Sequence, residues 1–226
     1  MDNIIQEHMM KKIIPMAFGL LWLSGCAQQV TSTQDTSIVT PVTCCSALDQ
    51  LPVQSFNGKS SLTLNFGAQT PKISENNTSV RAQVLALPNR DSAYTIEFTA
   101  PLNNEQFLAA QAVIYDADWK PLQKLEYKDF VYRTPAVLQS HRLFASMLVQ
   151  PGMKAPRWLV VSTVADPKPD RVKLIPESTI YAEKTQVEAP LELTKYGTAG
   201  DTGPLTVRIS RFSQLANELI NVVTGG

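Results

Sequence analysis

The chain has 226 residues, of which 44% are hydrophobic and 18% charged, so it carries enough apolar material for an ordinary globular core of one or two domains. Lys and Arg total 20 and Asp and Glu total 20, which leaves no excess positive field to attract nucleic acid or anionic lipid. This composition excludes a disordered tail and argues against nucleic acid as a partner.

The N-terminus has the three-part layout of a secretory signal peptide. Lys11 and Lys12 form the basic region, the apolar region runs from Ile13 to Leu23, and small residues follow. The apolar region is too short to span a membrane, which takes roughly 20 apolar residues. The sequence therefore predicts export, with residues 1–25 as the signal peptide.

The end of this segment, Leu23-Ser24-Gly25-Cys26, resembles the lipobox of bacterial lipoproteins. The resemblance implies cleavage before Cys26 and lipid attachment to it. Stable anchoring takes more than one acyl chain, because each buried CH₂ contributes only about 0.8 kcal/mol. The next residue is Ala27, whereas Asp at that position tends to retain lipoproteins at the inner membrane, so the resemblance implies the outer membrane. The alternative is a buried Cys26 at the end of a core helix.

Residues 26–43 are rich in Thr, Ser and Gln without sustained periodicity, which predicts a flexible tether before a single domain over residues 44–226. Cys44 and Cys45 are adjacent at the start of that domain. They are either two buried thiols near a short helix, a vicinal disulfide or a link to a second chain, and we favour the buried thiols. Metal binding would need more soft ligands than the chain offers, so we expect no metal.

Alternating apolar and polar residues predict strands along most of the domain. The stretch Phe107 to Leu122 predicts a central strand that breaks at an Asp-containing turn, and the run before it predicts a hairpin into it. The two runs before and after Pro151-Gly152 predict a pair of antiparallel strands. The predicted strand runs are Ser61 to Phe66, Ser79 to Leu87, Ala93 to Thr99, His141 to Val149, Arg157 to Val164 and Leu205 to Ile209.

Helical signals are few. One or two turns are expected near Cys44 to Leu51, and a short helix near Ser178 to Lys184. Arg211 to Val222 places apolar residues on one side of a C-terminal helix. Many short strands with frequent turn signals predict a mainly β fold, an antiparallel β-sandwich with a short C-terminal helix.

The order of features from Tyr94 to Ala182 resembles the maltose operon periplasmic protein (MalM) family. The resemblance rests on VIYDADWKP (Val113 to Pro121), DFVYRTPAV (Asp129 to Val137), the strand beginning at Arg142, and RWLVVST followed by a polar segment. It implies export to the periplasm and a link to maltodextrin uptake. No established catalytic residue is implied.

The residues themselves argue against catalysis. A Ser-His-acid nucleophile needs a His, and the chain beyond the signal peptide has only His141, without a Gly-x-Ser-x-Gly motif. Asp116 and Asp118 could form a carboxylate pair or bind calcium, but two Asp residues in one tight turn more often cap its backbone N–H groups. We therefore expect no catalytic residue and no cofactor.

Carbohydrate modules place flat aromatic side chains against the C–H face of a sugar ring. The candidate sugar-binding residues are Trp119, in the Asp turn, and then Tyr127, Phe130 and Tyr132. For Trp119 the alternative is packing over the sheet edge, and Trp158 is expected to face the core.

Together these features predict a non-catalytic, lipid-anchored protein that faces the periplasm and assists carbohydrate uptake. It would do so by weak binding of maltodextrin or by contact with a porin or periplasmic binding protein. The alternative is an envelope structural or assembly lipoprotein that binds protein or cell wall and no sugar.

Overall fold

Two antiparallel-rich sheets form the body of the fold. The computed structural model describes residues 45–75, 78–136, 139–150 and 155–211, all within one compact unit. The signal peptide, Cys26, the tether, Cys44 and the expected C-terminal helix lie outside the described residues.

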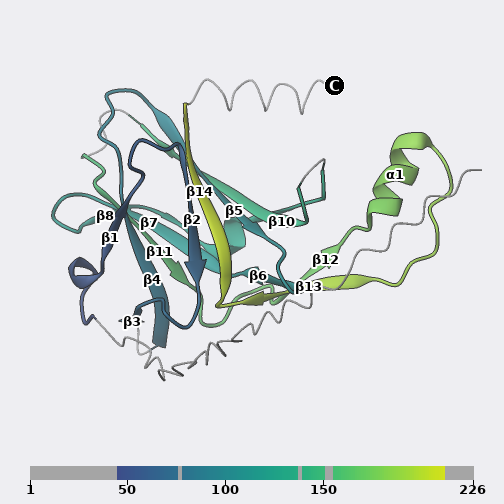
Figure 1. The fold of residues 1–226 in the computed structure, drawn as a ribbon, viewed down its shortest axis with the longest axis horizontal. Coiled ribbons are helices and arrows are strands. Elements are labelled where there is room, and N and C mark those ends of the chain that lie inside the picture. Colours follow the sequence, from purple (N-terminus) through teal and green to yellow (C-terminus); the bar gives the residue numbers. More distant parts are fainter. Residues whose placement is uncertain (1–44, 76–77, 137–138, 151–154, 212–226) are drawn as a thin grey trace, which may run out of the picture. The chain divides into compact units, whose positions relative to one another are not determined.

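The first sheet has six strands (Figure 1). Its order is β1 (Val53–Ser55), β4 (Thr78–Ala86), β11 (Trp158–Thr163), β7 (Ala110–Tyr115) and β8 (Pro121–Leu125), with β3 (Lys72–Glu75) also paired to β4. The pairing of β1 with β4 is parallel, and the other pairings in this sheet are antiparallel.

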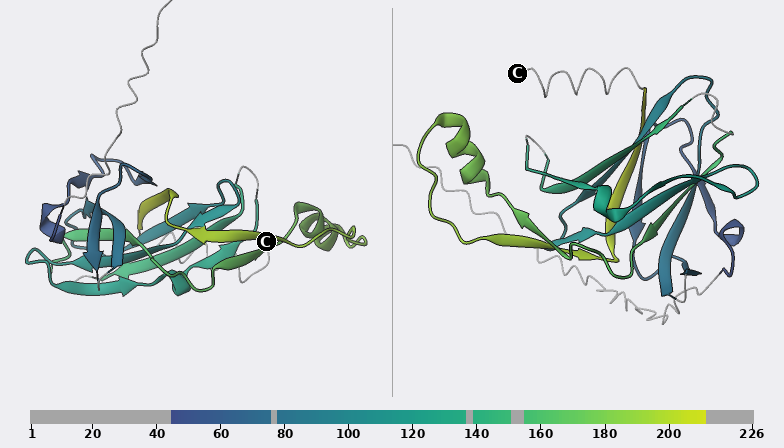
Figure 2. Two further views of the ribbon diagram at one scale, coloured as in Figure 1. Left: turned by 90° about the horizontal axis from the view of Figure 1, so that it is seen from below. Right: turned by 180° about the vertical axis from the view of Figure 1, so that it is seen from behind.

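The second sheet is antiparallel throughout, in the order β2 (Ser61–Phe66), β14 (Gly203–Arg211), β5 (Tyr94–Pro101), β10 (Arg142–Val149) and β9 (Val131–Arg133). A third sheet joins β12 (Arg171–Leu174), β13 (Lys195–Gly200) and β6 (Gln106–Leu108). The helical elements are the 3₁₀ turns η1 (Leu48–Gln50) and η2 (Tyr127–Asp129), and the helix α1 (Glu177–Thr185). Figures 1 and 2 show α1 beyond the β12–β13 ladder, away from the first two sheets.

The main core lies between the first two sheets. It draws alternate residues from both, including Ile114 and Leu159 of the first sheet and Phe98, Met147 and Val207 of the second. This two-sided burial is what a sandwich requires of inward-facing residues. The mainly β class and the sandwich architecture are confirmed.

A smaller cluster covers the other face of the first sheet. Val160 belongs to it, while its neighbours Leu159 and Val161 belong to the main core. Since successive side chains of a strand point to opposite faces, this places the smaller cluster on the outer side of the sheet. Both faces of β11 are therefore apolar, which explains its continuous hydrophobic run.

Two predicted strand pairings are wrong. The run Ala93 to Thr99 does not form a hairpin with the strand after it: β5 pairs with β10 and β14, whereas β7 pairs with β11 and β8. Likewise, β10 and β11 belong to different sheets and do not pair with each other. Alternation tells which face of a strand is buried, but it does not tell which strand lies beside it. In a sandwich the chain often crosses from one sheet to the other between successive strands.

The predicted central stretch is also more broken than expected. It contains β6, β7 and the beginning of β8, with Ala109 between the first two. Ala109 bonds to two different partners, donating to the carbonyl of Gly200 and accepting from the N–H of Val164. Among the described residues, no helix is long and apolar enough to cross a membrane.

Candidate functional site

The turn between β7 and β8 is built around the carboxylate of Asp116. Its Oδ1 accepts hydrogen bonds from the backbone N–H groups of Asp118 and Lys120, both at 2.9 Å. Asp116 is 8% exposed, whereas Asp118 is exposed. Asp116 therefore caps the turn, the role that its place in the sequence predicts, and its Oδ1 is committed to the backbone.

This turn sets the position of Trp119. Trp119 has a positive φ of 59°, and its N–H donates to the carbonyl of Asp116 at 3.3 Å. Its indole stacks on that of Trp158, with ring centroids 5.3 Å apart and planes 11° apart. The ring of Tyr115 lies 6.0 Å from that of Trp119, and the guanidinium of Arg157 lies 5.0 Å from the centroid of Trp158. These four residues form what we call the tryptophan cluster.

The tryptophan cluster lies on the outer face of the first sheet. Tyr115, Trp119 and Trp158 are each partly buried and pack against the smaller apolar cluster. Trp119 thus packs over the sheet, which is the alternative to sugar binding that the sequence analysis gave for it. The residue is only partly buried, so part of its surface stays exposed. Trp158 does not face the main core as expected, because it occupies the same face of β11 as Val160. The cluster offers aromatic surface that could meet the C–H face of a sugar ring.

The other three aromatic candidates lie elsewhere. Tyr127 is 6% exposed and belongs to the main core, and burial raises the pKa of its hydroxyl. Phe130 packs edge-on against Phe98, with ring centroids 6.3 Å apart. Tyr132 is partly buried against the same core. The structure therefore does not bring Trp119 together with this trio, and Tyr127 has little surface to offer a ligand.

His141 takes part in a polar link between β9, β10 and the segment after β12. The backbone N–H of Ile175 donates to Oη of Tyr132 at 3.0 Å, and this Oη lies 2.6 Å from Nδ1 of His141. Which of these two atoms donates depends on the tautomer of the ring, because a hydroxyl can both donate and accept. Burial lowers the pKa of His141, against the opposing effect of Glu177, and so favours the neutral ring. The contacts describe a structural histidine.

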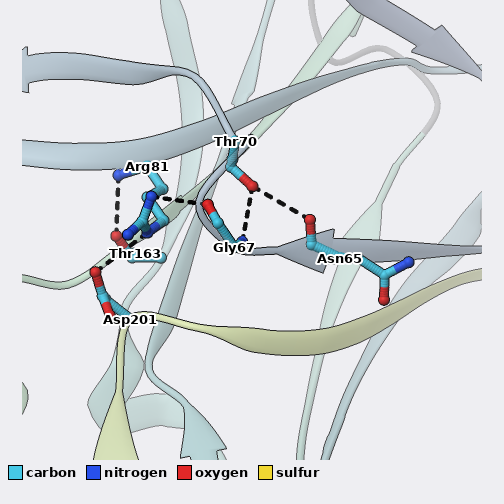
Figure 3. Close-up of polar contacts among 6 residues, drawn as sticks. All are labelled: Asn65, Gly67, Thr70, Arg81, Thr163 and Asp201. Carbon is cyan, nitrogen blue, oxygen red and sulfur yellow. Dashed lines mark hydrogen bonds and ion pairs between the residues drawn. The ribbon is translucent and has the colours of Figure 1, made fainter. Parts of the chain in front are cut away.

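Sequence reasoning missed a polar cluster around Arg81, which Figure 3 shows. Nη1 of Arg81 donates to the carbonyl of Gly67 at 2.8 Å, and its Nε lies 3.2 Å from Oδ2 of Asp201. The backbone N–H of Arg81 donates to Oγ1 of Thr163 at 3.1 Å. Oγ1 of Thr70 accepts from the N–H of Gly67 at 3.0 Å. These contacts tie β4 to β11 and to the β13–β14 turn. They engage the polar groups of Arg81 within the protein, which indicates a structural role for this cluster rather than a ligand site.

A cavity of about 310 Å³ lies beside Tyr94, at the start of β5. The guanidinium of Arg90 lies 5.5 Å from the centroid of its ring, and burial raises the pKa of Tyr94 to about 12. The Oη of Tyr94 is buried without a hydrogen-bond partner. Like the tryptophan cluster, this cavity brings polar side chains next to an aromatic ring. The ring of Tyr94 is almost wholly buried, however, so it offers little surface to a ligand.

Cys45 is disulfide-bonded and has a positive φ of 94°, so the favoured interpretation of free buried thiols is wrong for Cys45. Cys44 and Cys26 lie outside the described residues. Across residues 45–75, 78–136, 139–150 and 155–211, no group of three or more His, Cys, Asp or Glu side chains could hold a metal ion.

Comparisons with solved structures and curated proteins contribute little. The surface-associated copper-binding protein CorA of Methylomicrobium album BG8 is similar over 71% of this chain and 98% of its own, with 11% identity and a TM-score of 0.29. A score this low supports no inference about fold or ligand. No curated protein matches the chain significantly.

The comparison with family models gives a match. Residues 77–209 match the model described as "Maltose operon periplasmic protein precursor (MalM)". The match begins before β4 and ends within β14, so it takes in most of both main sheets, the Asp turn and α1. It covers more than half of the chain, and the chain therefore belongs to the MalM family of periplasmic protein precursors.

Proposed function

We propose that this protein is a non-catalytic, lipid-anchored accessory of carbohydrate uptake that faces the periplasm. The observation that carries the proposal is the match of residues 77–209 to the maltose operon periplasmic protein family. The absence of a nucleophile-elbow motif and the single His beyond the signal peptide support a non-catalytic role. The capping role of Asp116 and the hydrogen bonding of His141 agree with this reading.

The lipid anchor is proposed at Cys26, from the lipobox-like sequence that precedes it. Cys26→Ala should move the protein from the membrane fraction to the soluble fraction after cell disruption, and the intact mass of the wild type should show the acyl chains. Ser46→Ala, at an exposed residue near the start of the described domain, is the control and should leave the protein with the membrane. A wild type that keeps residues 1–25 and carries no acyl chain would contradict the anchor. Separation of the inner and outer membranes on a sucrose gradient then tests whether the protein is anchored to the outer membrane.

Sugar binding is proposed at the tryptophan cluster. The partly exposed ring of Trp119, stacked on Trp158, is rigid aromatic surface of the kind that carbohydrate modules use. We expect a pyranose ring on such a surface to bind weakly, because stacking on an aromatic face supplies only a small part of the binding energy. The expected ligand is a maltodextrin with an affinity in the millimolar range.

Intrinsic fluorescence is a sharp probe of this site. The chain has three tryptophans, and once the signal peptide with Trp22 is removed both remaining indoles belong to the tryptophan cluster. Titration with maltodextrins should give a saturable change in emission. Trp119→Ala should abolish it, whereas the control Tyr181→Ala, an exposed tyrosine outside the cluster, should leave it unchanged.

Calorimetry with the same sugars separates the outcomes. Heat of binding that survives Trp119→Ala would place the sugar elsewhere, for example in the cavity beside Tyr94. An absence of both heat and fluorescence change at millimolar sugar would refute sugar binding, and it would favour the alternative of an envelope structural or assembly lipoprotein. Contact with a porin or a periplasmic binding protein is tested by co-purification with each purified candidate.

A further inference from the structure

The segment from β12 to β13, residues 171–200, forms an arm that carries unusual apolar exposure. Figures 1 and 2 show α1 and its following segment beyond the main sheets. Leu191 and Leu193 are fully or almost fully exposed, and three further large side chains of the arm are more than two-fifths exposed: Tyr181, Val187 and Tyr196. Of the residues in α1, only Ala182 is buried. Clustered apolar exposure of this kind marks an interaction site.

The arm also carries a recess. A cavity of about 430 Å³ lies between α1 and residues 189–194. Its lining is largely apolar and includes Leu174, Ile175, Pro176, Pro190 and Leu191. The same arm thus offers exposed apolar side chains and a recess that could receive apolar side chains, and Leu191 and Leu193 also line that recess. A surface with both features is self-complementary, which is the property that a two-fold interface between identical chains requires.

Charge on the arm is divided in a matching way. β12 and β13 contain the cations Arg171, Lys173 and Lys195 and no Asp or Glu. The stretch between them contains one cation, Lys184, and four carboxylates: Glu177, Glu183, Glu188 and Glu192. Among the described residues, the ion pairs found involve none of these side chains. The acidic part of one arm would therefore complement the basic part of another.

The same charges argue against a membrane as the occupant. Segments that bind in the membrane interface place Lys and Arg beside their apolar residues, to meet anionic lipid. Here the exposed Leu191 and Leu193 flank Glu192, and Glu188 lies just before them. An acidic apolar segment would be repelled by such a surface.

We propose that the arm is a dimer interface, whose occupant is the arm of a second copy of this chain in two-fold symmetry. Leu191, Leu193 and Val187 of each copy would pack against the apolar recess of the other. The carboxylates of residues 177–192 in one copy would face Arg171, Lys173 and Lys195 of its partner. Each copy would contribute the same surface, so the assembly closes at two chains. The inference does not rest on sugar binding.

The first test is the mass of the assembly. Native mass spectrometry of the full-length protein, released from a mild detergent, should show a dimer. Leu191→Ser/Leu193→Ser should weaken dimerisation by about 100-fold, which corresponds to about 2.8 kcal/mol. Val131→Ser is the control, because Val131 is also an exposed apolar residue, 55% exposed, but lies on β9, outside the arm. These side chains are exposed, so the variants should fold.

A charge exchange tests the proposed pairing itself. A Glu188→Lys/Glu192→Lys chain and an Arg171→Glu/Lys173→Glu chain should each be mainly monomeric, because like charges would then face each other. An equal mixture of the two should form a mixed dimer. A wild type that is monomeric at micromolar concentration, a control as disruptive as the leucine variant, or a mixture that stays monomeric would overturn the proposal.

Discussion

Removing the carboxylate of Asp116 should destabilise the protein through one turn. Its Oδ1 accepts two backbone hydrogen bonds at 2.9 Å in a site that is 8% exposed. Hydrogen bonds to a charged group contribute about 1.5–3 kcal/mol each. Asp116→Ala leaves the backbone N–H groups of Asp118 and Lys120 without this acceptor, but both residues are exposed, so water can replace part of the lost bonding. The expected loss is about 2 kcal/mol, which lowers the melting temperature by about 4–8 °C for a unit of this size.

Thermal unfolding followed by circular dichroism measures this loss. Asp118→Ala is the matched control, because Asp118 is exposed and contributes its backbone to the turn rather than its side chain. It should change the free energy of unfolding by less than about 0.5 kcal/mol. Tryptophan emission should also shift in Asp116→Ala, because the turn positions Trp119 against Trp158. Equal losses in both variants, or no loss in Asp116→Ala, would refute the capping role.

Three further predictions concern stability. Burial lowers the pKa of His141 below its ordinary 6.5, so as the pH drops the unfolded chain takes up this proton before the folded chain does, and stability should fall below about pH 6.5. In thermal unfolding measured across this pH range, His141→Gln should reduce the dependence of stability on pH. An unchanged dependence would contradict the burial of His141. Burial raises the pKa of Tyr94 to about 12, so stability should fall as the pH rises from 10.0 toward 12. A titration followed by ultraviolet absorbance should show one tyrosine that ionises near pH 12. Ionisation of every tyrosine near pH 10.0 would count against the burial of Tyr94. In a denaturant titration, Gly197→Ala should lower the free energy of unfolding by about 1–3 kcal/mol, because the new Cβ would collide with the buried ring of Phe107. Gly67→Ala is the control and should lower it much less, because a Cβ at Gly67 meets open space. Similar losses in the two variants would contradict this packing.

The sequence predicted several strands correctly, some from alternation and others, such as β11, from a continuous apolar run. β2 spans Ser61–Phe66, as its alternation indicates, and β4, β5, β11 and β14 begin or end within a few residues of their predicted bounds. The helix expected near Ser178 to Lys184 is confirmed as α1. Alternation and continuous apolar runs are both local properties of the chain, so local reasoning finds them.

The elements that local reasoning missed depend on partners far away in the chain. β6 pairs in parallel with β13, so that Gln106 lies opposite Thr198. β12 and β1 are short, and little in their own sequences distinguishes them from loops. Strands of this kind form because a neighbour offers free backbone groups, and no pattern within four residues reports that neighbour.

The candidate site shows the same division. The capping role of Asp116 could be predicted because both of its bonds are to residues in the same turn. The stacking of Trp119 on Trp158 could not, since β11 is apolar on both faces and its sequence does not show which face Trp158 takes. The pair Arg81 and Asp201, separated by 120 positions, leaves no trace in the sequence at all.

The central claim is that the protein assists carbohydrate uptake, and the rate of uptake tests it most directly. Labelled maltotriose should be supplied, below the concentration that saturates transport, to cells with and without this chain. The account predicts slower uptake in cells that lack it, restored by the wild-type chain and not by Cys26→Ala. Equal uptake in cells with and without the chain would contradict the account.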